Sequence, residues 1–500
     1  MMFISYERKG DAEYAKLNTA VRKGGKKINE AVNLGRVLDK QKGIFKNRER
    51  GIFQFTIEDG YSEPAIEDVP DTPVRGKEQL IVDFGDTFLL NHVLKTSGMY
   101  DIIGALGYRN TDTLLTMVSY YVLCSHANSH VQDWWEGNYA RILYPKAVLD
   151  SRRISEFLSA IGNEQVIRVF FQCYLKHLFG VTGESEGMLI DSTGLPNSIH
   201  FPLTALSNHN GELHNEVRLI YVTQQDSGMP IYFRYCPGNV IDTSTLTRTI
   251  AELKQYGVNT KFAILDAGYY TDENIRLLYD HKISFVTRLK GNRRIYRDLV
   301  KAHVPTMETK ENLVRYNSRY AYITCVECEL IEGHRAYAYI GVDIERKNSE
   351  SRKTFRKAYD QKLSNHDVYE TMQSQGVFIL VSSRRIAKDN ILPVYYTRSQ
   401  IEQVFDIGKN YAQMLPVRVH KEETFRGHLL LTFMATVICK LIQDKTQQTH
   451  ITLESMIVNL RNHKCKVYPD AVIVQEAFKK VNDCYKLFKI NCPVQIHRQR

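Results

Sequence analysis

The chain has 500 residues, 43% of them hydrophobic and 24% charged, and a formal net charge of +10. It is too long for one ordinary domain and too apolar for a disordered chain, so we expect roughly two to four globular units. Its 29 glycines and 13 prolines exclude collagen-like and low-complexity chains. The nine cysteines are scattered and mostly lie in apolar runs, which is typical of reduced cytoplasmic thiols. The positive charge favours a polyanionic partner.

Neither export nor membrane insertion is expected. Residues 1–16 contain no apolar core followed by a small-residue cleavage site. The longest apolar stretch, Leu429 to Cys439, is about half as long as the roughly 20 residues that a membrane helix needs. We therefore expect a cytoplasmic protein without a membrane partner.

In chain order, the first three segments differ in charge and periodicity. Residues 1–57 predict a small basic β-rich unit, and residues 58–86 an acidic linker. In residues 87–184 apolar side chains recur at helical spacing, which predicts a helical domain. Within it, Ser151 is expected to cap a short basic helix that ends at Gly162. This helix either enters a DNA groove or is a solvated helix end.

The remaining segments predict an α/β fold with a mixed sheet covered by helices. Residues 185–304 contain short apolar runs that predict strands, with a helix over 242–256 capped by Asp242 or Thr243. Residues 305–375 predict a β-rich and basic insertion into this sheet domain. Residues 376–445 predict a strand at 376–383, a long helix beginning near Pro393 and a helix at 420–444. Residues 446–500 predict a basic helical region.

Two carboxylates follow apolar strand-like runs. Asp191 follows Met188 to Ile190, and Asp266 follows Phe262 to Leu265. A carboxylate in such a position is costly to bury unless it is paired or binds a metal. An aspartate that opens a turn after a strand is the alternative interpretation of each.

Four polar residues share one face of the helix predicted after Pro393: Tyr395, Arg398, Glu402 and Lys409. A carboxylate beside a phenol, a guanidinium and an ammonium suits a site that holds both a cation and phosphate oxygens. A surface stripe of ion pairs is the alternative. Asp406 lies near the same face and is a rival carboxylate.

The spacing Y395-x2-R398-x3-E402-x6-K409 resembles the Y-R-E-K signature of bacterial insertion-sequence transposases of the DDE class. The upstream strings IDSTG around Asp191 and ILDAGYY around Asp266 resemble the other two acidic motifs of that family. The string TFRGHLLLTFMA at 424–435 resembles its downstream helix. The resemblance covers about residues 185–445. It implies a ribonuclease-H-like core with a β-rich insertion, preceded by a domain at 87–184 that binds element-end DNA.

The resemblance also implies an activity and roles for residues. Asp191 would contact two Mg²⁺ or Mn²⁺ ions, while Asp266 and Glu402 would each hold one. One ion would activate water or a 3′-hydroxyl and the other would stabilise the leaving oxygen. Tyr395, Arg398 and Lys409 would clamp phosphates near the element end. The implied partners are element-end DNA, target DNA and a second copy of the chain, in the nucleoid.

Other basic and aromatic residues are weaker candidates. Four basic residues that follow a predicted strand could bind DNA or be solvated loop charges: Arg288, Lys290, Arg293 and Arg294. Some relatives stack a flipped base on a tryptophan of the insertion. Here both tryptophans, Trp134 and Trp135, lie in the helical region, so Phe378 and Tyr396 are the candidates for stacking. Cys325 and Cys328 are expected to be buried thiols rather than zinc ligands.

The sequence leaves two alternatives to a transposase that cuts element ends and joins them to target DNA. A ribonuclease-H-like nuclease would hydrolyse DNA without joining it, with the same residues. A catalytically inactive protein derived from such an element would bind DNA without cutting it.

Overall fold

The computed structural model describes residues 2–10, 12–23, 26–65, 68–70, 77–183, 186–197, 201–209, 212–240, 244–360, 368, 371–372 and 374–498. The chain divides into two compact units. Unit 1 comprises Met1–Ser97, Ser129–Leu149 and Ile442–Arg500, and unit 2 comprises Gly98–Asn128 and Asp150–Leu441. Both units are therefore built from segments that are distant in the sequence.

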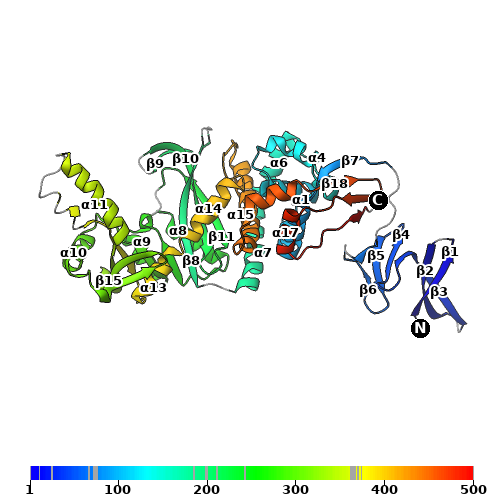
Figure 1. The fold of residues 1–500 in the computed structure, drawn as a ribbon, viewed down its shortest axis with the longest axis horizontal. Helices are drawn as coiled ribbons and strands as arrows, with labels where there is room; N and C mark the ends of the chain where they lie inside the picture. Colours follow the sequence, from blue (N-terminus) through cyan, green and yellow to red (C-terminus); the bar gives the residue numbers. More distant parts are fainter. Residues whose placement is uncertain are drawn as a thin grey trace. The chain divides into compact units, whose positions relative to one another are not determined.

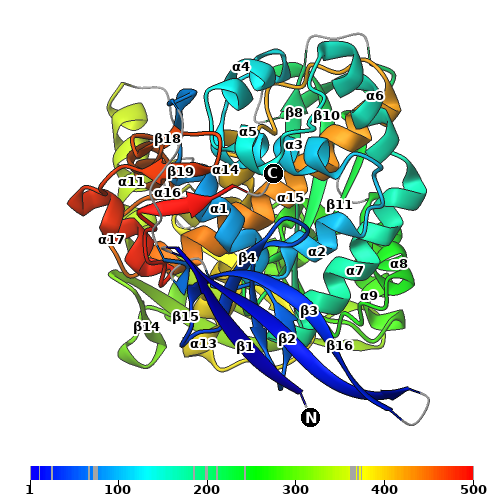
Figure 2. The ribbon, with the colours of Figure 1, turned by 90° about the vertical axis from the view of Figure 1, so that its right-hand side faces the viewer.

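The N-terminal part of unit 1 is a six-stranded antiparallel meander in the order β1-β2-β3-β4-β5-β6. Its long first strands are prominent in Figure 2. The strands are β1 (Met2–Lys9), β2 (Ala12–Lys23), β3 (Lys26–Asp39), β4 (Ile44–Asn47), β5 (Gly51–Thr56) and β6 (Gly60–Ser62). Alternating residues such as Ala15 and Leu17, and Phe53 and Phe55, bury one face in a small core. The sequence predicts its small β-rich unit over this segment.

The rest of unit 1 is a second antiparallel sheet in the order β20-β19-β18-β7. Its strands are β7 (Leu80–Asp83), β18 (Lys464–Val467), β19 (Ala471–Val474) and β20 (Gln495–His497). Its helices are α1 (Gly85–Thr96), α4 (Val131–Glu136), α5 (Ala140–Leu143), α16 (Leu453–Arg461) and α17 (Lys479–Leu487). Strand β7 and the start of α1 thus lie where the sequence predicts a linker. The region predicted as helical after residue 446 contains three strands besides α16 and α17, because strands of three or four residues leave no clear periodicity.

Unit 2 is built on one mixed sheet in the order β11-β10-β8-β12-β13-β17-β16-β15-β14, with β9 paired to β10. Strands β8, β12 and β13 are parallel, and the other pairs are antiparallel. The first six strands are β8 (Gly187–Pro196), β9 (Ala205–His209), β10 (Glu212–Gln224), β11 (Pro230–Pro237), β12 (Phe262–Leu265) and β13 (Ser284–Arg288). The strands that the sequence predicts at 188–193, 216–225, 229–236, 261–268 and 283–290 are confirmed within a few residues at their ends.

The segment predicted as an insertion extends this sheet rather than forming a sheet of its own. Its strands are β14 (Leu313–Tyr316), β15 (Arg319–Ile331) and β16 (His334–Asp343). Strand β16 pairs with β17 (Val377–Ser382), which itself pairs with β13. The basic helix α11 (Ile344–Tyr359) follows β16 and contacts β15 and β16. Parts of 361–373 lie outside the described residues.

Helices cover the sheet of unit 2 (Figure 1). The helices of unit 2 are α2 (Met99–Gly104), α3 (Thr111–Leu123), α6 (Ser151–Ile161), α7 (Glu164–Thr182), α8 (Leu246–Gln255), α9 (Asp272–Asp280), α10 (Arg294–His303), α13 (Lys388–Tyr396), α14 (Ser399–Asn410) and α15 (Glu422–Thr446). Short 3-10 helices are η2 (Asn128–His130), η4 (Ala267–Tyr269), η5 (Val304–Thr306) and η6 (Lys310–Asn312). Asp150, not Ser151, caps α6 by accepting a hydrogen bond from the Arg153 amide. The predicted caps Asp242 and Thr243 lie outside the described residues.

Helix α15, whose residues up to Leu441 belong to unit 2, is the main core helix of that unit. By length and composition α15 could cross a membrane, but 89% of its most apolar stretch is buried inside the protein. Phe433 is fully buried and contacts the rings of Phe171, Tyr221 and Phe233. The helix also comes very close to the end of α6, because a Cβ on Gly427 would lie 2.0 Å from the carbonyl oxygen of Leu158. Its apolar character is therefore that of a core helix.

Candidate active site

Adjacent parallel strands bring the two predicted aspartates together. In the register of β8 and β12, Ile190 is opposite Leu265, so Asp191 and Asp266 occupy the next position on each strand. Asp191 does not end its strand, since β8 continues to Pro196 and Asp191 pairs with Tyr221 of β10. Asp266 directly follows β12 and precedes the 3-10 turn η4. The sheet topology thus explains why two residues 75 positions apart become neighbours.

The third carboxylate, Glu402, comes from α14, and the connection between α13 and α14 orients its neighbour Arg398. The prediction of one helix beginning near Pro393 is wrong, because α13 begins at Lys388 and ends at Tyr396. The amide of Arg398 donates to the carbonyl of Tyr395 at 3.2 Å, and that of Ile401 donates to Arg398 at 3.1 Å. These i to i−3 bonds form a tight turn between two helices. Arg398 lies at this turn, at the start of α14.

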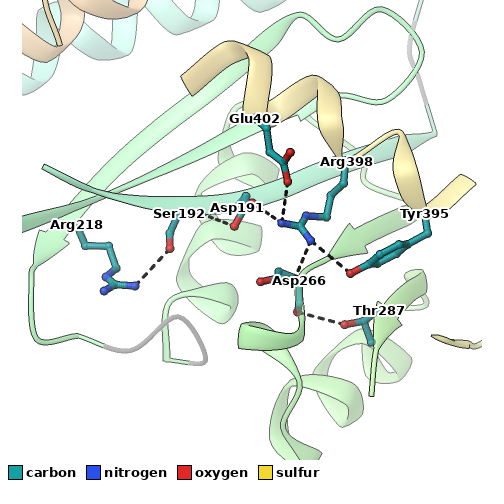
Figure 3. Close-up of polar contacts among 8 residues, drawn as sticks. All are labelled: Asp191, Ser192, Arg218, Asp266, Thr287, Tyr395, Arg398 and Glu402. Carbon is teal, nitrogen blue, oxygen red and sulfur yellow. Dashed lines mark hydrogen bonds and ion pairs between the residues drawn. The ribbon is translucent and has the colours of Figure 1, made fainter. Parts of the chain in front are cut away.

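The guanidinium of Arg398 lies among the three carboxylates (Figure 3). Its Nη1 is 2.8 Å from Oδ1 of Asp266, and its Nη2 is 3.2 Å from Oδ2 of Asp191. Nη2 is also 3.3 Å from Oε1 of Glu402, and Nη1 donates to the Tyr395 hydroxyl at 3.3 Å. Side-chain exposure rises from 13% for Asp191 to 39% for Asp266 and 61% for Glu402. The cluster therefore opens to solvent on the Glu402 side.

Burial dominates the electrostatics of Asp191. It raises the pKa of Asp191 to about 6, from an ordinary value of 3.8, although Arg398 and the Ser192 amide oppose the rise. The folded state thus binds this proton more tightly than the unfolded state does. The contribution to stability is full below about pH 4 and is lost as the pH rises through about 6.

We therefore predict that Asp191→Asn becomes more stable, relative to the natural protein, as the pH rises. Without added metal, the difference in the free energy of unfolding should grow by on the order of 2 kcal/mol between pH 4 and pH 7. Urea unfolding of both proteins across this range measures it. Gln403→Ala, which removes an exposed side chain of α14 that does not titrate, is the control and should show a flat difference. A flat difference for Asp191→Asn too would contradict the prediction.

Two buried charged residues that the sequence interpretation missed support Asp191 from β10. The Ser192 amide donates to Oδ1 of Asp191 at 2.8 Å, and Nη1 of Arg218 lies 3.5 Å from the Ser192 hydroxyl (Figure 3). Arg218 forms an ion pair of 3.2 Å with Glu216, and both are buried. The absence of a side chain at Gly194 leaves space for the Glu216 side chain, because a Cβ there would lie 1.9 Å from a Glu216 carboxylate oxygen. The signal was present as two charges at i and i+2 in an apolar strand.

Lys409 and Asp406 also belong to α14, but they differ in where they point. Nζ of Lys409 donates to the Thr193 hydroxyl at 2.6 Å, and Thr193 shares a face of β8 with Asp191 because they are two residues apart. Burial lowers the pKa of Lys409, with Glu216 opposing this. Asp406 is exposed and accepts a hydrogen bond from Asn410 at 2.6 Å. Lys409 therefore belongs to the site, and Asp406 does not contact it.

The stretch that carries this cluster matches a known family. A family model described as "Transposase DDE domain" matches residues 182–438, about half of the chain and all three carboxylates. The chain belongs to the DDE transposase family. No curated protein matches its sequence. Among solved structures, the chain is similar to one described as a cryo-EM structure of the piggyBac transposase synaptic complex with hairpin DNA. That similarity has 11% identity and a TM-score of 0.40, over 75% of this chain and 77% of that chain.

The four basic residues at the end of β13 and just after it in this transposase do not contact the carboxylate cluster. Arg288 lines a neighbouring cleft. Nζ of Lys290 lies 3.4 Å from the Gly268 carbonyl, and Arg293 pairs with Asp272 at 3.3 Å. Arg294 is 92% exposed and lies 3.6 Å from Asp298. Their role in binding DNA stays a prediction.

A cleft of about 430 Å³ adjoins the transposase's carboxylate cluster at Tyr395. Three arginines line it, Arg288, Arg319 and Arg346, together with the aromatic residues Phe378 and Tyr396. Tyr396 stacks on Tyr316 with ring centroids 5.1 Å apart and planes at 16°. The opposite strand leaves room for Phe378, because a Cβ on Gly341 would lie 2.2 Å from its ring. Both residues that the sequence proposes for stacking thus line one cleft.

Three carboxylates supply the oxygen ligands that Mg²⁺ and Mn²⁺ prefer. Their arrangement in this conformation does not fit a divalent cation. Among the described residues, no group of three or more His, Cys, Asp or Glu side chains lies close enough to hold a metal ion. The guanidinium of Arg398 contacts all three carboxylates instead. Cys325 and Cys328, which the sequence predicts as buried thiols, are half-buried, and burial raises the pKa of both thiols.

Proposed function

We propose that this DDE transposase cuts DNA at the ends of its own mobile element and joins them to target DNA, with divalent cations as cofactors. One observation carries the proposal: Asp191, Asp266 and Glu402 come from three separate elements and converge within the matched stretch. A strand end, a mid-strand position and a helix place these carboxylates around one point that opens to solvent on the side of Glu402. The family relationship supplies the chemistry that such a cluster performs.

We further propose the Y-R-E-K subtype, a ribonuclease-H-like core and a bacterial insertion sequence as the origin. The four signature residues support the subtype, because Arg398 contacts the carboxylates, Tyr395 accepts a hydrogen bond from Arg398, and Lys409 reaches Thr193 on the face of β8 that carries Asp191. The central order β11-β10-β8-β12-β13, with antiparallel strands beside parallel ones, supports the core. We also propose that two copies act together on the two element ends, in the nucleoid.

Each side chain has a distinct role in this proposal. Asp191, Asp266 and Glu402 would hold divalent cations once Arg398 no longer lies among them, and bound cations would supply activation of the attacking oxygen and stabilisation of the leaving one. Tyr395 and Lys409 bind phosphate oxygens and hold the scissile phosphodiester against the cluster. Arg218 and Glu216 are positioning residues that hold β8 from the neighbouring strand β10. The basic face of α11 contacts DNA further from the cut.

A strand-transfer assay tests the proposal. The full chain is incubated with labelled element-end DNA, a supercoiled target plasmid and Mg²⁺, and products are separated by size. We expect cleaved ends and ends joined to the plasmid. Cleavage without joining would favour the nuclease, and DNA binding without cleavage would favour the inactive element-derived protein.

The cleft beside Tyr395 leads to a prediction about the element end. We propose that a base which leaves the duplex stacks on Phe378 and Tyr396 while the arginines hold its phosphates. Because stacking contributes about 1–3 kcal/mol per base, Phe378→Ala or Tyr396→Ala should slow end processing by roughly 5- to 150-fold. Fluorescence of 2-aminopurine at the terminal positions reports whether a base unstacks.

The matched control for the cleft is Tyr359→Ala, which removes a tyrosine that is 90% exposed on α11. It should leave the 2-aminopurine signal unchanged. If both cleft variants also retained the full signal and rate, the cleft would not be the site of stacking.

A further inference from the structure

The guanidinium of Arg398 occupies the space between the three carboxylates. Arg398 is largely buried, at 18% exposure, and its two terminal nitrogens contact Asp191, Asp266 and Glu402. A guanidinium and a divalent cation repel each other strongly at such distances, and more so where water is partly excluded. A cation and the present position of Arg398 are therefore mutually exclusive.

The guanidinium also accounts for how three carboxylates remain close without a metal. Three negative charges at one point repel one another, and Asp191 has lost most of its hydration. Arg398 offsets part of this charge through planar, two-pronged contacts that a guanidinium makes well. It is the residue that holds β8, β12 and α14 together at this point.

The position of Arg398 would allow its side chain to leave the cluster. It lies at the tight turn between α13 and α14, and the cluster opens to solvent on the side of Glu402. Next to Tyr395, the cleft is lined by Arg288, Arg319 and Arg346 and also by Asp343 and Glu345. Arg319 pairs with Glu345 at 3.5 Å and Arg346 with Glu350 at 2.7 Å, so the lining keeps a small excess of positive charge that favours a polyanion at this mouth. A phosphate placed there would offer Arg398 the same two-pronged contact that it now makes with the aspartates.

We propose that Arg398 is an internal counter-cation that closes the site until a DNA phosphate draws it out, which lets divalent cations enter. This inference rests on the proposed function for the identity of the anion. By linkage, DNA then raises the affinity for the cation, and the cation raises the affinity for DNA by the same factor. Without bound DNA, the transposase would then hold no divalent cation between its carboxylates and would be inactive.

Mn²⁺ binding to the full chain without DNA tests this, measured by electron paramagnetic resonance of free Mn²⁺. Arg398→Gln should bind Mn²⁺ at least about tenfold more tightly than the natural protein, since typical coupling between sites is 5- to 150-fold. Arg248→Gln on α8 is the matched control, because it removes a positive charge from a side chain that is 74% exposed and lines neither the cluster nor the cleft. It should bind Mn²⁺ within about twofold of the natural protein.

Circular dichroism shows whether Arg398→Gln is folded. If it is not, Arg398→Lys decides, because one ammonium cannot make the contacts of both guanidinium nitrogens. It should bind Mn²⁺ more tightly than the natural protein but less so than a neutral residue would. A folded variant with unchanged or weaker Mn²⁺ affinity overturns the proposal.

Adding element-end DNA completes the test. It should narrow the difference in Mn²⁺ affinity between the natural protein and Arg398→Gln, because DNA draws the arginine away only where one is present. An unchanged difference would overturn the link to phosphate. The measurement without DNA does not depend on cleavage, so a failure of the proposed function in the strand-transfer assay would be seen separately.

Discussion

Asp191→Asn, Asp266→Asn and Glu402→Gln should each lower the rate of element-end cleavage in Mg²⁺ by at least about a thousandfold, or about 4 kcal/mol of transition-state stabilisation. The physical reason is that each substitution removes one charged oxygen ligand from the converging cluster. Asp191 should show the largest loss, because it is the most buried of the three and lies between the other elements. The measurement is single-turnover cleavage of labelled end DNA.

Asp406→Asn is the matched control for this series. Asp406 lies one helical turn from Glu402 on α14, is exposed and bonds to Asn410 rather than to the cluster. It should cut at the natural rate. Full activity in any of the three cluster variants, or a loss confined to Asp406→Asn, would refute the assignment of the carboxylates.

Phe433→Ala should destabilise unit 2 by about 3–5 kcal/mol, the usual cost of removing a buried aromatic ring from a core. Phe433 lies at the centre of an aromatic cluster contributed by α7, β10 and β11. Tyr221 of this cluster also stacks on Phe405 of α14, at 5.5 Å between centroids and 15° between planes. The cavity would therefore loosen the helix that carries Glu402 as well as the core.

Urea unfolding followed by circular dichroism measures the effect of Phe433→Ala. Tryptophan fluorescence reports the unfolding of unit 1 separately, because Trp134 and Trp135 both lie in α4 of unit 1. Phe355→Ala on α11 is the control, since this ring is half exposed, and it should cost less than about 1 kcal/mol. A midpoint for Phe433→Ala equal to that of the control would show that the ring is not part of a close-packed core.

Local pattern predicted much of unit 2. Apolar runs identified the strands that carry Asp191 and Asp266, since buried strands in a parallel sheet need continuous hydrophobic side chains. Helical spacing placed Tyr395, Arg398 and Glu402 together, and this survived the break between α13 and α14. The break itself was not predictable, because Thr397 and Arg398 both keep helical backbone angles and neither is a Gly or Pro.

What local pattern could not supply were contacts between distant segments. The pairing of β16 with β17 joins the predicted insertion to the sheet, but strand periodicity does not name a partner. Glu216 and Arg218 were visible as charges in a strand, yet their partnership with Ser192 depends on the register of β10 on β8. The inward position of Arg398 likewise depends on two strands that the helix meets only in the folded chain.

The pairing of β7 with β18 has a consequence for how the protein is made. Leu80 of β7 lies opposite Val467 of β18, so this sheet joins segments almost 400 residues apart. On the ribosome, β7 emerges early and remains without its strand partner β18 while all of unit 2 is synthesised. A message truncated after Thr446 would encode every residue of the carboxylate cluster and still leave that edge exposed. Such fragments should be cleared or aggregate, and so few of them would accumulate to interfere with the intact enzyme.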